Sequence, residues 1–174
     1  MLELILRGSV GLLPVLIFLA VLVYLDSYKL VRFRVVLAAI AAGCVAAGGS
    51  YVLNVAGLEL TGWSLTTFSR YVSPIIEEAF KGIIIVYLIR KNRIGFPVDA
   101  AIFGFAAGAG FAMIENLYYL GVLSHSHLAV WIVRGFGTAI MHGGATAIFA
   151  IVAHTLAEES QSTGISVLAP GFVV

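Results

Sequence analysis

Long apolar runs separated by short polar breaks make up most of the chain. The runs extend over about residues 10–25, 35–58, 67–89, 100–120 and 129–156. A helix needs about 20 mainly apolar residues to cross the hydrocarbon core of a bilayer, and the runs are of that order. The pattern predicts an all-α fold, a polytopic transmembrane bundle of about five membrane-spanning helices that forms a single membrane-embedded domain over residues 1–174.

Composition supports a membrane protein and narrows the classes of partner. Hydrophobic residues make up 61% of the chain and charged residues only 11%, and the mean hydropathy is +1.06, far from the average of soluble proteins. A net charge of +1, with no basic patch interleaved with aromatic residues, excludes nucleic acid as a partner. The single cysteine, Cys44, excludes an intrachain disulfide and a cysteine-based metal site. The lipid bilayer is the first partner that we expect.

The basic residues indicate how the helices are oriented. The breaks after the second and fourth runs hold no lysine or arginine. The breaks after the first and third runs hold six of these residues: Lys29, Arg32, Arg34, Arg90, Lys91 and Arg93. Because basic loops stay in the cytoplasm, we expect the N-terminus outside and the C-terminus in the cytoplasm.

Three ionisable residues, Glu77, Glu78 and Lys81, interrupt the third apolar run. Each charge near the centre of a membrane helix costs about 2.5 to 3.5 kcal/mol, while each large apolar residue returns only about 0.3 to 0.6 kcal/mol. Neighbouring helices or a polar cavity must therefore shelter these charges, which makes the segment a candidate functional site. Pro74 lies one turn before the glutamates and should kink the helix by clashing with the carbonyl of Arg70.

The fourth run carries Glu115 on the same helix stripe as Gly104 and Gly108, a G-x-x-x-G pattern that lets helices approach closely. Asn116 follows directly. Glu115 therefore lies on the face that we expect to press against neighbouring helices.

The fifth run supplies His142 about half-way along its length, with Arg134 to one side. Arg134 could pair with Glu115 or extend outward to the interface, and helix geometry leaves both open. Counting at about 1.5 Å per residue places the polar residues of the three runs at compatible depths. One pocket in the outer half of the membrane could hold Glu77, Glu78, Lys81, Glu115, Asn116 and His142.

These residues, in this order, resemble the PrsW family of intramembrane proteases, which is related to the CAAX-protease and bacteriocin-processing group. Three motifs carry the resemblance. They are Glu-Glu-x-x-Lys at 77–81, a glycine-rich helix ending Gly-Phe-Ala-Met-Ile-Glu-Asn-Leu-Tyr at 110–118, and Arg134 and His142 on the next helix. The resemblance extends over about residues 74–144.

The resemblance implies a multi-pass protease of a cell membrane, most simply the prokaryotic cytoplasmic membrane. Its substrate would be a membrane-anchored regulatory protein with a transmembrane segment, of which anti-sigma factors are the usual example, and a homo-oligomer is compatible with the family. The resemblance assigns catalytic roles to Glu77, Glu78, Glu115 and His142, with Lys81, Asn116 and Arg134 in support.

The implied chemistry is hydrolysis of an amide by an activated water. One glutamate would act as general base and its neighbour as acid, because two adjacent carboxylates in an apolar pocket do not readily both carry charge. His142 would stabilise the oxyanion or shuttle the proton, with the Asn116 amide as a second donor. Glu77, Glu78, Glu115 and His142 also form a ligand set compatible with Zn or Mn, so a glutamate mechanism and a metal-dependent one both stay open.

Other functions could use the same buried charges. A proton- or ion-coupled carrier should show internal repeats or a second broken helix, and the sequence contains no convincing inverted repeat. A catalytically silent scaffold would use the charges only as an ion-pair network between helices. The joint occurrence of the three motifs favours the protease.

Overall fold

The computed structural model describes residues 2–25, 31–123 and 126–160, and all the regular structure in these ranges is helical. Lys29, one of the basic residues used for orientation, lies outside the described residues. The elements are α1 (Leu2–Leu25), α2 (Phe33–Thr61), α3 (Leu65–Tyr71), α4 (Ser73–Arg90), α5 (Pro97–Val122), α6 (Leu128–Thr138), the π-helical segment η1 (Ala139–Gly144) and α7 (Ala145–Ser160). The predicted all-α fold is confirmed.

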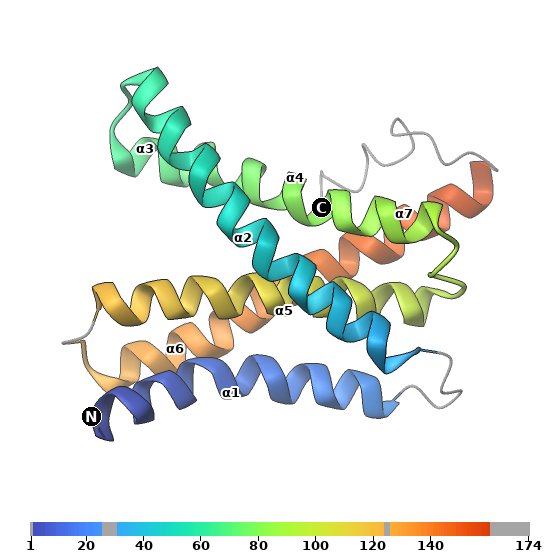
Figure 1. The fold of residues 1–174 in the computed structure, drawn as a ribbon, viewed down its shortest axis with the longest axis horizontal. Helices are drawn as coiled ribbons and strands as arrows, with labels where there is room; N and C mark the ends of the chain where they lie inside the picture. Colours follow the sequence, from blue (N-terminus) through green and yellow to red (C-terminus); the bar gives the residue numbers. More distant parts are fainter. Residues whose placement is uncertain (1, 26–30, 124–125, 161–174) are drawn as a thin grey trace.

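Helix α5 lies at the centre of the bundle. In its most apolar stretch 72% of the residues are buried, compared with 22% for α1 and 33% for α2. In Figure 1, α2 crosses over α5 while α1 and α6 lie along one side of it, and α7 also packs against α5. The helix that carries Glu115 is thus the one that touches most of the others.

Glycines set how closely the helices cross. A Cβ on Gly43 of α2 would overlap the carbonyl of Ala107, and one on Gly110 of α5 would overlap the carbonyl of Ile40. A Cβ on Gly104 would lie 2.6 Å from the Thr146 carbonyl oxygen of α7. The backbones touch at these points, as the glycine pattern of the fourth run predicts.

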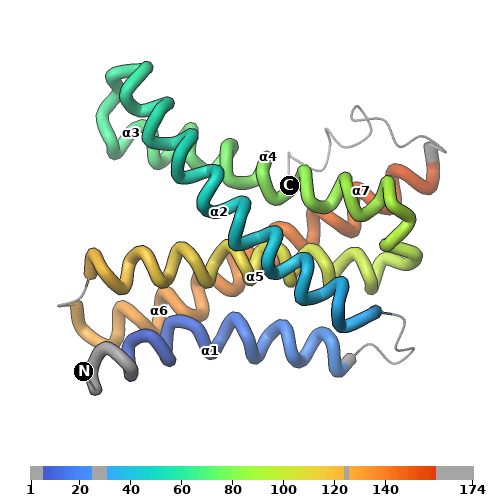
Figure 2. The backbone as a smooth tube through the Cα atoms, in the orientation of Figure 1, coloured from blue at the N-terminus to red at the C-terminus, as the bar shows by residue number. Residues whose placement is uncertain are grey.

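The predicted third span is two helices rather than one kinked helix. The chain reverses after α2, forms the short α3 and then enters α4, as the tube in Figure 2 shows. Pro74 lies in the first turn of α4, where backbone N–H groups have no intrahelical acceptor, so the missing N–H of proline removes no hydrogen bond. The expected clash with Arg70 is therefore avoided by a break at Val72, and the prediction of a kink inside one helix was wrong.

Four helical segments are long and apolar enough to cross a membrane: Leu6–Tyr24, Phe33–Thr61, Pro97–Val122 and Leu128–Glu159. The last of these includes α6, η1 and α7. Helix α4 is not among them, because its 18 residues include Glu77, Glu78, Lys81 and Arg90. The protein is a multi-helix membrane protein, and a fifth span at α4 stays a prediction.

Candidate active site

Lys81 joins the motif of α4 to the histidine of η1. Its side chain is completely buried, and its Nζ lies 2.5 Å from Glu78 Oε1 and 3.0 Å from His142 Nδ1. The ammonium group also lies 4.7 Å above the centre of the Phe111 ring on α5. A buried ammonium needs this many partners because its desolvation is costly.

Glu115 receives hydrogen bonds on both carboxylate oxygens. Its Oε2 lies 2.6 Å from His142 Nε2, and its Oε1 accepts from Arg134 Nη2 at 3.2 Å. The Arg134 guanidinium stacks on Tyr119, with its central carbon 3.8 Å from the ring centre. Of the two alternatives for Arg134, the structure shows the pairing with Glu115.

Asn116 connects the site to α1. Its Nδ2 donates to the Gly11 carbonyl at 3.0 Å and to Thr138 Oγ1 at 2.9 Å, while its Oδ1 accepts from Arg134 at 3.3 Å. Both amide hydrogens are thus engaged inside the protein. The expected role of Asn116 as an oxyanion donor does not match this arrangement, and Asn116 instead fixes α1 and α6 against α5.

Glu77 differs from the other two glutamates. It is half-buried and within electrostatic range of His142, Glu115 and Lys81. Within the described part of the chain, no residue forms a hydrogen bond or an ion pair with its carboxylate. The site therefore contains one carboxylate that is not committed to a cation.

The π-helical segment positions His142. A π turn adds a residue to the helical repeat and is frequent at functional sites. Thr146 Oγ1 donates to the His142 carbonyl at 2.7 Å, and this part of the backbone lies directly on Gly108 of α5. A side chain larger than glycine at 108 would push the histidine away from Glu115.

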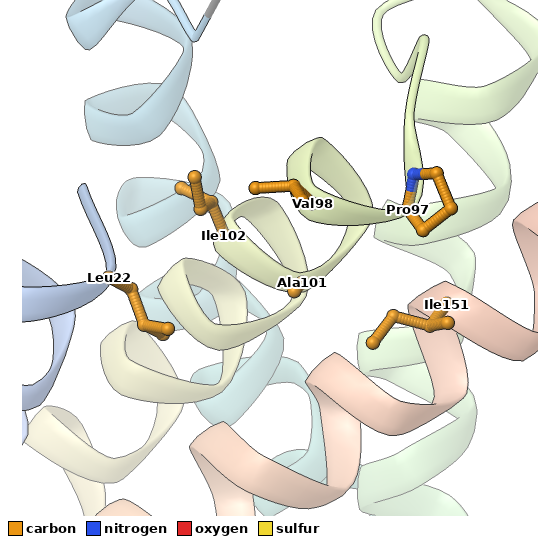
Figure 3. A pocket seen from close by; sticks show the side chains of 6 residues that line it. All are labelled: Leu22, Pro97, Val98, Ala101, Ile102 and Ile151. Atoms are coloured by element: carbon orange, nitrogen blue, oxygen red, sulfur yellow. The ribbon is translucent and has the colours of Figure 1, made fainter. Parts of the chain in front are cut away.

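An apolar cavity lined by described residues lies away from this cluster. It has a volume of about 290 Å³ and apolar walls contributed by α1, α5 and α7: Leu22, Pro97, Val98, Ala101, Ile102 and Ile151 (Figure 3). No ionisable side chain lines it. The polar cluster, not this cavity, is the candidate site.

A model of the PrsW family, described as intramembrane metalloproteases, matches residues 29–174. The chain belongs to the PrsW family. The match includes α2 to α7 and reaches well beyond the motif region at 74–144. Searches of curated proteins and of solved structures return no match.

Membership makes the chain an intramembrane protease by family. The structure brings together six of the seven predicted site residues in one chain of hydrogen bonds, with Glu77 beside it: Glu78, Lys81, His142, Glu115, Arg134 and Asn116. The predicted convergence of three helices is what the structure shows.

The PrsW family description implies a metal, and the side chains do not fit one as they are arranged. Within residues 2–25, 31–123 and 126–160, no group of three or more His, Cys, Asp or Glu side chains is placed to hold a metal ion. Both ring nitrogens of His142 are engaged, one by Lys81 and one by Glu115. The predicted set for Zn or Mn, Glu77, Glu78, Glu115 and His142, is not assembled around a common point.

Sequence reasoning missed several residues of the candidate site. Phe111 contacts both Lys81 and His142, with 5.0 Å between the phenyl and imidazole ring centres. Tyr119 supports Arg134, and Thr138 accepts from Asn116. A signal existed, because Phe111 and Tyr119 share the helix stripe of Glu115, and Thr138 shares the stripe of His142.

Proposed function

We propose that this chain hydrolyses a peptide bond of a membrane-anchored regulatory protein, with Glu77 as the general base. The substrate would carry a transmembrane segment, as anti-sigma factors do, and the protease would reside in a prokaryotic cytoplasmic membrane. The positive-inside pattern supports an orientation in which the site lies in the outer half of that membrane.

The observation that carries the assignment is the balance of charges. Three glutamates meet two cations, and each cation is bound to one glutamate, Lys81 to Glu78 and Arg134 to Glu115. A carboxylate that already accepts from a cation is a weaker base than one that does not. Glu77 is the carboxylate left to accept a proton, which favours Glu77 over Glu78 as the base.

In the proposed reaction, the oxygen of a water molecule attacks the carbonyl carbon of the substrate while Glu77 takes a proton from that water. Lys81 is buried against Glu78 and His142, so it favours the oxyanion through its positive charge and does not contact the substrate. Glu77 then passes its proton to the leaving nitrogen as the C–N bond breaks. His142, Glu115 and Arg134 hold Lys81 and the helices in place for this step.

The test is cleavage of a panel of single-span proteins in liposomes, with and without a chelator. We expect Glu77→Gln to reduce kcat by about 10² to 10⁴, the usual contribution of a general base. Glu78→Gln should retain more activity and lose more thermal stability. Glu59→Gln, at an exposed glutamate at the far end of α2, is the matched control and should cleave normally.

Two results would contradict the proposal. One is a Glu77→Gln variant that cleaves at the wild-type rate. The other is a wild type that cleaves nothing while ion flux in the same liposomes depends on Glu77, which would indicate an ion-coupled carrier. Absence of both cleavage and flux would indicate a silent scaffold.

A further inference from the structure

Hydrogen-bond chemistry determines where the protons on His142 lie. An ammonium group only donates, so Lys81 Nζ must donate to His142 Nδ1 across their 3.0 Å contact. Nδ1 therefore carries a lone pair. The hydrogen of a neutral imidazole is then on Nε2, where it points at Glu115 Oε2 at 2.6 Å and donates to a carboxylate.

We propose that Lys81 is a positioning residue that takes the place of a divalent metal ion in this site. It holds His142 as the neutral tautomer with hydrogen on Nε2, and it leaves the histidine no lone pair for a metal. The inference rests on the proposed function and deepens it, because the positive charge that a metal ion would bring to the site is then supplied, from a buried position, by the lysine of the motif.

The surrounding charges support the same conclusion. A histidine binds metal through a deprotonated ring nitrogen, and neither nitrogen of His142 is available. Glu115 accepts on both oxygens, and Glu78 accepts from Lys81. A divalent ion at His142 would also face a buried ammonium about one hydrogen-bond length from its ligand, where Coulomb repulsion is strong because little water screens it.

Removing the lysine should therefore create a metal site. In Lys81→Met the Nδ1 lone pair becomes free, Glu78 loses its cation, and the positive charge that repels a metal is gone. Lys81→Arg keeps a charged donor and should keep the wild-type arrangement. Lys91→Met removes a lysine at the exposed end of α4 and is the matched control.

The experiment is performed on the full 174-residue chain in detergent or lipid, without substrate. Histidine labelled with ¹⁵N reports which ring nitrogen carries hydrogen, and His142→Gln assigns the signals. We expect an unprotonated Nδ1 and a protonated Nε2 at His142 in the wild type, in Lys81→Arg and in Lys91→Met. In Co²⁺ titrations followed by ligand-field absorption, Lys81→Met should bind at least about tenfold more tightly than wild type, the scale on which partners of a ligand alter metal affinity.

A wild type whose His142 carries hydrogen on Nδ1 would overturn the inference. So would tight binding of Co²⁺ that shifts the His142 signals while Lys81 is present. The wild-type tautomer needs no variant, so a misfolded Lys81→Met protein would still leave the inference open to refutation. Because neither readout uses substrate, a chain that cleaves nothing yet shows the expected tautomer contradicts the proposed function alone.

Discussion

Replacing Gly108 with alanine should displace His142 and slow catalysis about 10²-fold. The added Cβ would lie 2.5 Å from the carbonyl carbon of His142 and 2.8 Å from the Cα of Gly143. Carbon atoms in contact are about 3.5 Å apart, so the backbone of η1 must retreat by roughly 1 Å. Both neighbours are backbone atoms, which cannot rotate out of the way as a side chain can.

That displacement is large compared with the hydrogen bond that it disturbs. His142 Nε2 and Glu115 Oε2 are 2.6 Å apart, and a retreat of about 1 Å along their line would separate them by about 3.6 Å, beyond hydrogen-bonding range. A misplacement of this size typically costs about 10²-fold in rate. Overpacking itself should lower the free energy of unfolding by about 1 to 3 kcal/mol.

The assay is the initial rate of cleavage of a single-span substrate in liposomes, together with thermal unfolding in detergent. Gly144→Ala is the matched control, because it lies in the same π segment and its added Cβ would meet nothing within 4 Å. We expect Gly144→Ala to cleave normally and to unfold at the same or a slightly higher temperature, since alanine is preferred over glycine in a helix by about 0.5 to 1 kcal/mol. If Gly108→Ala also cleaves at the wild-type rate, the close approach of η1 to α5 does not position His142.

Other variants test the supports of the site. Arg134→Met should lower kcat at least about tenfold, because Glu115 loses a charged donor. Arg134→Lys should recover only part of the lost rate, since lysine cannot reproduce the planar stack on Tyr119. Equal rates for the wild type and both variants would contradict this. Asn116→Leu removes the amide that joins the Gly11 carbonyl to Thr138 and Arg134, and it should cost about 1 to 3 kcal/mol of unfolding free energy. Denaturation measures this loss, and an unchanged transition would be the contrary result. Asp99→Ala removes the side chain that accepts from the backbone N–H groups of Gly95 and Phe96, just before α5, and we expect a loss of about 0.5 to 2 kcal/mol with normal cleavage.

The membrane helices and the members of the site could be predicted because the bilayer leaves few choices. The bilayer core contains no water to bind the backbone N–H and C=O groups of an apolar run, so the run forms a helix, in which these groups bind one another. Ionisable residues in such runs must meet one another, so Glu115 and His142 were expected beside the Glu-Glu-x-x-Lys motif. The small residues around Gly108 indicated the helix face on which they would meet.

Which groups pair depends on distances between helices, and these follow only from packing. Helical spacing allowed Lys81 to reach either glutamate, and the position of η1 decided for Glu78 and His142. The sequence likewise could not distinguish a break at Val72 from a kink within one helix, because Pro74 is compatible with either. Contacts with neighbouring helices decide between the two.

By itself, then, the sequence determined that the chain lies in a membrane, where its four long apolar helical segments are and which charged side chains must be sheltered together. Each of these follows from local transfer energies and from a spacing of 3.6 residues per turn. Only the tertiary structure decided that Glu77 is left without a cation, that Asn116 binds α1 and that Lys81 holds His142. Those outcomes rest on hydrogen bonds of about 3 Å between helices, and a shift of 1 Å, which no sequence pattern specifies, is enough to change the partners.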